Sequence, residues 1–224
     1  MSPNDPTDQD VPDLLEVYRH LFDHFGPQHW WPAESPFEVI VGAVLTQNTA
    51  WVNVEKAIAQ LRAADLLRLD ALNAVSESKL AQCIRASGFF NLKARRLKAV
   101  TAFIFSEYEG SLERMFAAPG PKLREKLLTV KGLGPETVDS ILLYAGQKPF
   151  FVIDAYTRRI FSRHQWLDAR KSYESLQAYF MSQQPRHTQT FNEYHALIVK
   201  TAKVYCKKRA DCDKCPLRIY PAFP

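Results

Sequence analysis

Apolar side chains recur at every third or fourth position along most of the chain, and this spacing restricts the fold more than any other feature of the sequence. Leu14, Val17 and Leu21 follow one another in this way near the start, which would place them on one face of a helix. No segment alternates polar and apolar residues for long enough to predict a β-strand. The pattern therefore predicts an all-α protein.

The helical spacing divides the chain into segments that are bounded by capping residues, proline or glycine. We predict helices at residues 13–25, 37–45, 49–63, 91–108, 122–128, 135–145, 151–164, 172–184 and 188–205, with two short helices between 65 and 87. Residues 1–11 are polar, and we expect them to form a disordered tail.

Composition excludes several broad classes of protein. The chain has 224 residues, of which 46% are hydrophobic and 24% charged, as is ordinary for a globular protein with a large core. No apolar run approaches the roughly 18 residues of a membrane span. The acidic, polar start is unlike a signal peptide. We therefore expect a cytoplasmic protein that makes no use of a membrane, associated with the nucleoid if the source is bacterial.

Basic residues are concentrated in two regions of the sequence. The net charge is +5, and lysine and arginine gather in residues 85–131 and 200–218. These regions are either one surface for a polyanion such as nucleic acid or two ordinary solvated helix faces.

Three of the four cysteines lie close together near the C-terminal end. Cys206, Cys212 and Cys215 fall within ten residues. Clustered thiols with a C-x2-C step are typical of metal or iron–sulfur ligands, whereas a disulfide framework is not expected inside a cell. A closed metal site needs four ligands, and this segment offers three.

Residues 128–145 have the pattern of a helix, a tight turn and a second helix. Gly132, Leu133 and Gly134 form the turn, where glycine allows positive φ and lets backbone amides approach a ligand. Pro135 suits the first position of the second helix. Such a helix-hairpin-helix motif can bind phosphates of the DNA backbone without reading sequence. An ordinary turn between two helices is the alternative.

A single aspartate stands out after the hairpin. Asp154 follows the apolar run Phe150 to Ile153 and precedes a basic segment. An aspartate in this position can simply cap a helix. Its distance of about twenty residues from the hairpin makes it also a candidate functional carboxylate.

The hairpin, Asp154, the LTQNT segment at 45–49 and the clustered cysteines occur in an order that resembles the endonuclease III branch of the helix-hairpin-helix DNA glycosylases. The resemblance covers most of residues 14–218. Segments 30–32, 37–51 and 87–97 are most similar to the 3-methyladenine DNA glycosylase III type, which removes alkylated purines from DNA.

The resemblance implies a fold and a reaction. Residues 36–150 would form one helical domain, and residues 1–35 and 151–224 the other, with a DNA-binding cleft. Asp154 would be the catalytic residue, stabilising an oxocarbenium-like transition state and orienting the attacking water. Bifunctional members carry a lysine that forms a Schiff base where this chain has Glu136. We therefore expect a monofunctional enzyme that leaves an abasic site.

The resemblance also assigns residues to the substrate and to DNA. The substrate pocket would include Trp30, Trp31, Pro32 and Trp51, because a cationic purine stacks well on indole rings. Glu136 either lies at the pocket mouth or only complements the start of its helix. Contacts to DNA are expected from residues Gln47, Asn48, Lys93, Gly132, Leu133, Gly134 and Arg159. Of these, Gln47 would fill the gap that the flipped base leaves.

The cysteine segment departs from the family pattern. The iron–sulfur loop of the family has four cysteines with the spacing C-x6-C-x2-C-x5-C, whereas this chain has C-x5-C-x2-C and Pro221 in the fourth position. The 3-methyladenine type lacks the cluster, so we expect no cofactor. A [4Fe–4S] cluster with an incomplete set of cysteines (Cys206, Cys212 and Cys215) is the alternative.

Three other functions are compatible with the sequence. A glycosylase of the same fold could act on oxidised pyrimidines or mismatches. A non-catalytic homologue could bind DNA only. The three cysteines could serve a metal or redox module. In the preferred interpretation the partner is damaged double-stranded DNA, and the protein acts as a monomer.

Overall fold

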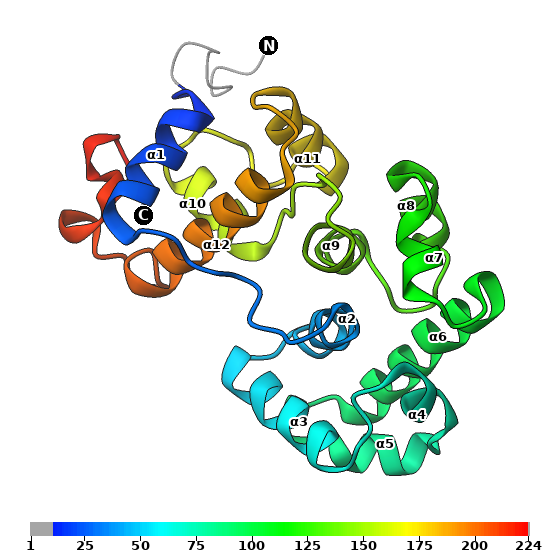
Figure 1. Ribbon diagram of the computed structural model, residues 1–224. Coiled ribbons are helices and arrows are strands. Elements are labelled where there is room, and N and C mark those ends of the chain that lie inside the picture. Colours follow the sequence, from blue (N-terminus) through cyan, green and yellow to red (C-terminus); the bar gives the residue numbers. More distant parts are fainter. Residues whose placement is uncertain (1–10, 224) are drawn as a thin grey trace. The chain divides into compact units, whose positions relative to one another are not determined.

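The computed structural model describes residues 11–223, and all of its regular elements over that range are helices (Figure 1). The all-α class is therefore confirmed. The expected disordered tail lies outside the described residues, apart from position 11. None of the described helices is long and apolar enough to cross a membrane.

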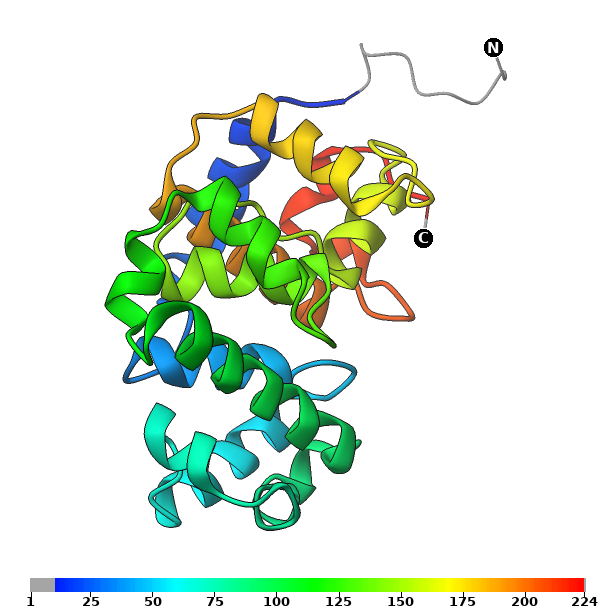
Figure 2. The same cartoon turned by 90° about the vertical axis from the view of Figure 1, so that its right-hand side faces the viewer.

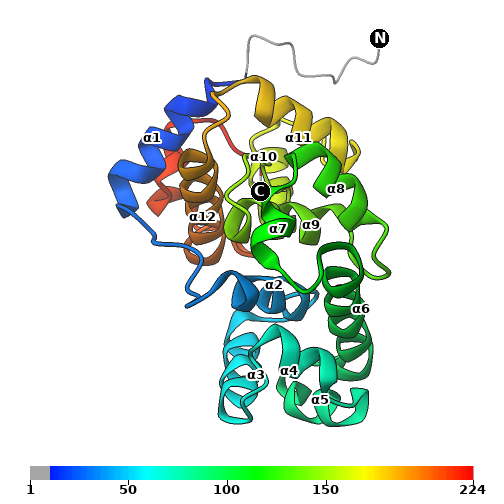
Figure 3. The same ribbon diagram turned by 45° about the vertical axis from the view of Figure 1, so that its right-hand side comes forward.

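The described chain divides into two compact units. The terminal unit comprises residues 11–30 and 149–223, and the central unit comprises residues 31–148. The terminal unit contains α1 (Leu14–Phe25), α10 (Ala155–Arg163), α11 (Tyr173–Ser182), α12 (Thr188–Val204) and two 3₁₀ turns, η3 (Cys212–Lys214) and η4 (Pro216–Ile219). Within it, α12 packs against both α1 and α10 (Figure 3).

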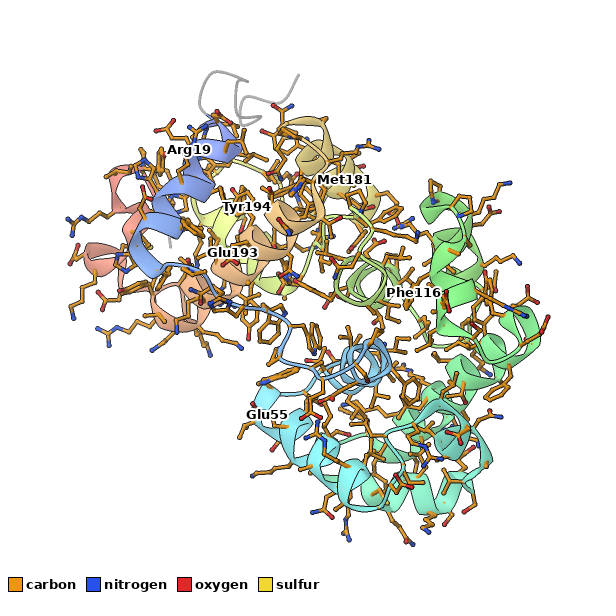
Figure 4. All side chains as sticks on the ribbon, in the orientation of Figure 1. Arg19, Glu55, Phe116, Met181, Glu193 and Tyr194 are labelled. Atoms are coloured by element: carbon orange, nitrogen blue, oxygen red, sulfur yellow. The ribbon has the colours of Figure 1, made fainter. Side chains whose placement is uncertain are left out.

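Aromatic rings fill the core of the terminal unit. Phe151 stacks on Phe180 with ring centroids 4.4 Å apart, and Phe191 and Tyr194 meet Phe151 edge-on. Tyr194 extends from α12 into this core (Figure 4) and is fully buried. Ring packing of this kind fixes α12 against the segment that leads into α10.

The central unit is built around one helix that is buried on all sides from Phe37 to Leu45. Its elements are α2 (Pro36–Leu45), α3 (Trp51–Ala63), α4 (Leu69–Ala74), α5 (Glu77–Cys83), η1 (Arg85–Ser87), α6 (Phe90–Tyr108), α7 (Leu112–Ala117), α8 (Gly120–Leu128), α9 (Pro135–Ser140) and the π-helical turn η2 (Ile141–Ala145). Every residue of α2 from Phe37 to Leu45 is buried, as expected for a core helix. Helices α4 and α5 pack against α6 (Figure 2).

Two elements differ from the sequence prediction. The expected helix at 151–164 starts only at Ala155, because residues 151–153 are extended and buried. Asp154 caps the helix, so its first turn cannot begin earlier. The short helix α7 was not predicted, since its six residues are too few to show a clear helical period.

Candidate active site

Asp154 is the N-cap of α10, and its two carboxylate oxygens have different surroundings. Oδ1 accepts hydrogen bonds from the backbone N of Thr157 at 2.7 Å and from Oγ1 of Thr157 at 2.9 Å. Oδ2 lies 3.6 Å from Nε2 of His195 on α12. The Asp154 side chain is 12% exposed. The helix cap therefore uses one oxygen and leaves the other directed at the histidine.

The surroundings of Asp154 favour its charged form. Burial raises the pKa of the carboxyl, but the positive charge of a protonated His195 and the two bonds from Thr157 outweigh it. The pKa of Asp154 is therefore held below its ordinary value, and the group is a carboxylate at neutral pH. A buried negative charge of this kind can stabilise positive charge that develops on a bound sugar.

His195 was missed in the sequence analysis. It lies in the middle of α12 among apolar neighbours and is itself buried. A single histidine in such a helix gives no local signal of its partner, because Asp154 is brought to it only by the packing of α10 against α12. No motif in the sequence links the two residues.

The predicted hairpin is present in the central unit. Gly132 has a φ of +93°, and a Cβ added there would lie 2.5 Å from Cγ of Arg96. Only glycine fits this position. Leu133 is buried, while Gly134 caps α9 and Pro135 begins it. The hairpin therefore offers its backbone, and not the side chain of Leu133, to a ligand.

Gln47 connects the end of α2 to the hairpin. Its Nε2 donates to Oγ1 of Thr137 at 2.8 Å and to the carbonyl of Gly132 at 3.2 Å, and its Oε1 accepts from the guanidinium of Arg96. These bonds hold the side-chain amide inside the central unit. Its neighbour Asn48 is exposed and has a φ of +52°. Of the two, Asn48 is the one that faces solvent.

The prediction that Lys93 contacts DNA from an exposed basic face is not supported by its position. Lys93 is fully buried, and its ammonium donates to the carbonyls of Leu45 and Ser87 and to Oγ1 of Thr49. Burial, followed by the nearby positive charge of Arg96, lowers the pKa of Lys93 to about 8. The helical spacing predicted that Lys93 lies on α6. It could not show that oxygen atoms of other segments surround the ammonium.

Two of the predicted pocket tryptophans meet in the central unit. The rings of Trp31 and Trp51 are 5.2 Å apart at 84°, and Tyr144, which the sequence analysis missed, lies 5.2 Å from Trp31. The indole of Trp31 lies against Gly42, where an added Cβ would be 3.1 Å from the ring. We call Trp31, Trp51 and Tyr144 the aromatic cluster.

The other predicted pocket residues lie in loops or at the start of a helix. Trp30 belongs to the terminal unit, where the ammonium of Lys203 lies 5.9 Å from its ring. Pro32 is exposed in the central unit. Glu136 is exposed in the first turn of α9, where a negative charge complements the helix start. Of the predicted pocket residues, Trp31 and Trp51 meet within the central unit.

Arg159 and the cysteines are joined within the terminal unit. The guanidinium of Arg159 donates to the carbonyls of Cys206 and Ala202. Arg163, one turn further along α10, donates to Sγ of Cys206 at 3.2 Å and to the carbonyls that follow it. These bonds direct Arg159 toward the cysteine segment, so at least part of its guanidinium is committed to the fold.

The cysteine segment does not fit a four-cysteine iron–sulfur cluster. Cys206, Cys212 and Cys215 border a cavity of about 250 Å³, together with Arg163 and Pro221. Pro221, which stands in the position of the fourth ligand, has no side-chain donor atom to give. Among the described residues, no group of three or more His, Cys, Asp or Glu side chains is arranged to hold a metal ion.

A glycine hairpin at a helix start can bind a phosphate of the DNA backbone, and a buried carboxylate can stabilise positive charge on a sugar, so the site favours a protein that acts on DNA. Comparison with known proteins confirms this class. Residues 41–186 match the profile of the HhH-GPD superfamily of base excision DNA repair proteins. The chain belongs to this family and is a DNA glycosylase of base excision repair.

Individual relatives cover most of the chain. A protein of Methanocaldococcus jannaschii, named provisionally as a DNA repair glycosylase, is 46% identical over 92% of this chain and 94% of its own length. Endonuclease III of Sulfolobus acidocaldarius is 28% identical over 82% of this chain and 80% of its own length. Both likenesses extend well beyond the hairpin.

Solved structures agree with this fold. The 3-methyladenine DNA glycosylase of H. pylori, bound to 1,N6-ethenoadenine, has a TM-score of 0.74 and 31% identity over 86% of this chain and 98% of its own. A non-covalent endonuclease III–DNA complex has a TM-score of 0.80 at 21% identity, covering 96% of this chain and 95% of its own, which is a likeness of fold. The predicted family is therefore confirmed, while the lesion and the type of cleavage are questions for the site itself.

Proposed function

We propose that this glycosylase is monofunctional and hydrolyses the N-glycosidic bond of alkylated purines in double-stranded DNA, leaving an abasic site. The aromatic cluster is the observation that supports alkylated purines as the substrate. Trp31 packs against Gly42 and meets Trp51 and Tyr144 within one unit. Electron-rich rings attract a flat, positively charged purine more strongly than a neutral base. The likeness to the H. pylori 3-methyladenine enzyme supports the same choice.

In this proposal Asp154 supplies the electrostatic part of catalysis. Its Oδ1 is held by Thr157, so the carboxylate has one fixed orientation. Its Oδ2 would stabilise the positive charge that builds up on the sugar as the bond breaks, and would orient the attacking water. An alkylated purine already carries positive charge and leaves without a second acid, so one carboxylate is enough.

Two residues, Glu136 and Lys93, are the basis for proposing that the enzyme lacks lyase activity. Glu136 stands in the position of the Schiff-base lysine, and a carboxylate cannot form that bond. Lys93 has the lowered pKa that a nucleophilic amine needs. Its nitrogen is nevertheless buried and donates three hydrogen bonds, so it has no access to a sugar.

Two exposed side chains are proposed to enter the duplex when the base is flipped. Asn48 and Phe89 both have positive φ, and Phe89 is 68% exposed. An apolar ring that enters between base steps can hold a duplex open. The sequence analysis missed Phe89, although an aromatic residue directly after Gly88 in a turn is a visible signal.

An incision assay on methylated duplex DNA tests the proposed reaction. We expect strand breaks only after alkali treatment, and none with the Asp154→Asn variant. Breaks without alkali would contradict the monofunctional assignment. The assay includes duplexes with an oxidised pyrimidine and with a T·G mismatch, because the likeness to endonuclease III makes these the second candidate substrates. Faster release of either would move the substrate assignment to that lesion.

The proposal also describes one chain acting alone in the cytoplasm. Light scattering of the protein at assay concentration should give a mass near 25.7 kDa, both free and after removal from DNA. A mass of twice that value would contradict a monomer.

A further inference from the structure

Two surface turns of the central unit share an unusual backbone conformation. The first turn, residues 46–50, follows α2, and the second, residues 84–89, precedes α6. Each holds a residue other than glycine with positive φ, +52° at Asn48 and +46° at Phe89. Such residues are strained, and they persist only where the surrounding structure fixes them.

One buried ammonium connects the two turns. Nζ of Lys93, one turn into α6, donates to the carbonyl of Leu45 at 2.8 Å and to Oγ1 of Thr49 at 2.5 Å, both at the first turn. It also donates to the carbonyl of Ser87 in the second turn at 2.6 Å. Thr49 Oγ1 in turn donates to the same Ser87 carbonyl at 2.5 Å. All three N–H groups of the ammonium therefore have acceptors, and these acceptors come from both turns.

This network needs an ammonium and no other group. Three acceptor oxygens meet at one buried point, and only a lysine side chain presents three donors from a single atom. A planar arginine fork has the wrong geometry for one point, and an apolar side chain would leave buried acceptors without donors. The three hydrogen bonds offset part of the cost of burying the charge.

We infer that Lys93 is a positioning residue for base flipping: its buried ammonium fixes the spacing of the Asn48 and Phe89 turns, so that both side chains can enter the duplex together. The inference rests on the proposed glycosylase reaction. It assigns to Lys93 a role that acts through the two turns and requires no contact with DNA. Loss of the ammonium would not change the sequence of either turn, but the two turns could then move independently of each other.

The same helix provides a matched control. Lys98, further along α6, also donates its ammonium to three carbonyl groups, those of Leu72, Asn73 and Val75 at the end of α4. Lys93→Met and Lys98→Met therefore remove the same chemical group from the same helix. Only Lys93 is bonded to the turns that carry Asn48 and Phe89.

The experiment measures base flipping separately from bond cleavage. Each methionine variant is made in the active protein and in an Asp154→Asn background, and 2-aminopurine beside the lesion reports unstacking by its fluorescence. Single-turnover excision with saturating enzyme is measured for the active proteins, and thermal unfolding for all of them. We expect both variants to unfold at lower temperature. Lys93→Met should lose most of the fluorescence rise and about tenfold or more in single-turnover rate, whereas Lys98→Met should stay within about twofold.

A milder variant keeps the test decisive if Lys93→Met does not fold. Thr49→Val removes the hydroxyl that bridges Lys93 and Ser87 and preserves the shape of the side chain. It should reduce the fluorescence rise by an intermediate amount. Equal losses in Lys93→Met and Lys98→Met, or an unchanged signal in Thr49→Val, would overturn the inference while wild-type excision still supported the proposed function. A wild-type protein that neither unstacks the probe nor excises any lesion would overturn both.

Discussion

Asp154 in the terminal unit and Lys93 in the central unit are both buried charged groups, and they are held in different ways. Oδ1 of Asp154 accepts two hydrogen bonds from Thr157, whereas its Oδ2 lies 3.6 Å from Nε2 of His195. Every donor of Lys93 is bonded to a neutral oxygen of its own unit. A carboxylate oxygen that takes no part in the helix cap can act on a substrate. A charged group whose donors are all bonded inside the protein can act only on the groups around it.

Replacement of Asp154 should have the largest effect and tests the chemical side of this comparison. Asn is also a good helix cap, so Asp154→Asn should fold normally while excision falls by roughly a thousandfold. Single-turnover excision and thermal unfolding measure the two outcomes, and affinity for undamaged DNA is the control. An unfolding temperature that drops along with activity would mean that the charge serves the fold more than the reaction.

His195 should have the next largest effect, through the charge of Asp154. Since a protonated His195 helps to lower the pKa of Asp154, His195→Gln should raise that pKa. Excision should then be lost at a higher pH on the acidic side of its profile, with about a tenfold lower rate at neutral pH. An acidic limb that stays in place would show that Asp154 keeps its charge without the histidine. Measurement of the complete pH–rate profile distinguishes this shift from a uniform loss.

Titration of Lys93 should have a smaller effect on stability. Its folded-state pKa of about 8 lies below the ordinary value of 10.5, so the unfolded chain binds more protons between those two values. Its contribution to the free energy of unfolding should therefore rise with pH through this window, and be lost as the pH falls to 8. The difference between wild type and Lys93→Met, measured by urea unfolding, should grow by on the order of 1 kcal/mol.

Above pH 8, base flipping should change in the opposite direction. A neutral amine has two N–H groups for three acceptors, so the two turns would be held less firmly even as global stability rises. Fluorescence of the 2-aminopurine probe should decrease with pH in the wild type and stay flat in Lys93→Met. A parallel decrease in both proteins would assign the pH effect to another titrating group of the protein or to the DNA itself.

The smallest effect is expected at the cysteine segment, which lies outside the comparison of buried charges. Cys212 is only partly buried and has no assigned ligand role. Cys212→Ser should change the free energy of unfolding by less than about 0.5 kcal/mol and leave excision unchanged. Visible absorbance of the purified wild-type protein that disappears in this variant would instead show a bound cluster.

Local signals in the sequence predicted most elements of this fold, and the errors fell on a capped helix start and on a helix of six residues. Helical periodicity was sufficient for α1, α3 and α6, where apolar faces repeat over several turns. It extended the helix at 151–164 too far, because the buried strand-like residues 151–153 are as apolar as a helix face. Helical periodicity is a property of one segment at a time, so it cannot show which other segments pack against that segment.

The residues of the candidate site also fall into two groups, those predicted from local signals and those that depend on contacts distant in sequence. Asp154 and Gly132 follow from local chemistry, namely a helix cap and a turn position that only glycine can occupy. The pairing of His195 with Asp154 and the burial of Lys93 depend on which helices meet, and the spacing of charges in the sequence contains no such information. Lys93 resembles a surface lysine on α6 until the oxygens of two other segments are placed around it.

The two hydrogen bonds that Thr157 donates to Asp154 have a consequence for how this family changes over evolutionary time. A lineage that loses the reaction would still need a short polar residue at this position to begin α10, so selection for folding alone can preserve an aspartate. The presence of the aspartate in a related genome is then weak proof of activity. Drift from aspartate to asparagine or serine, with the helix intact, would be the mark left by a lineage in which the enzyme has become a passive binder.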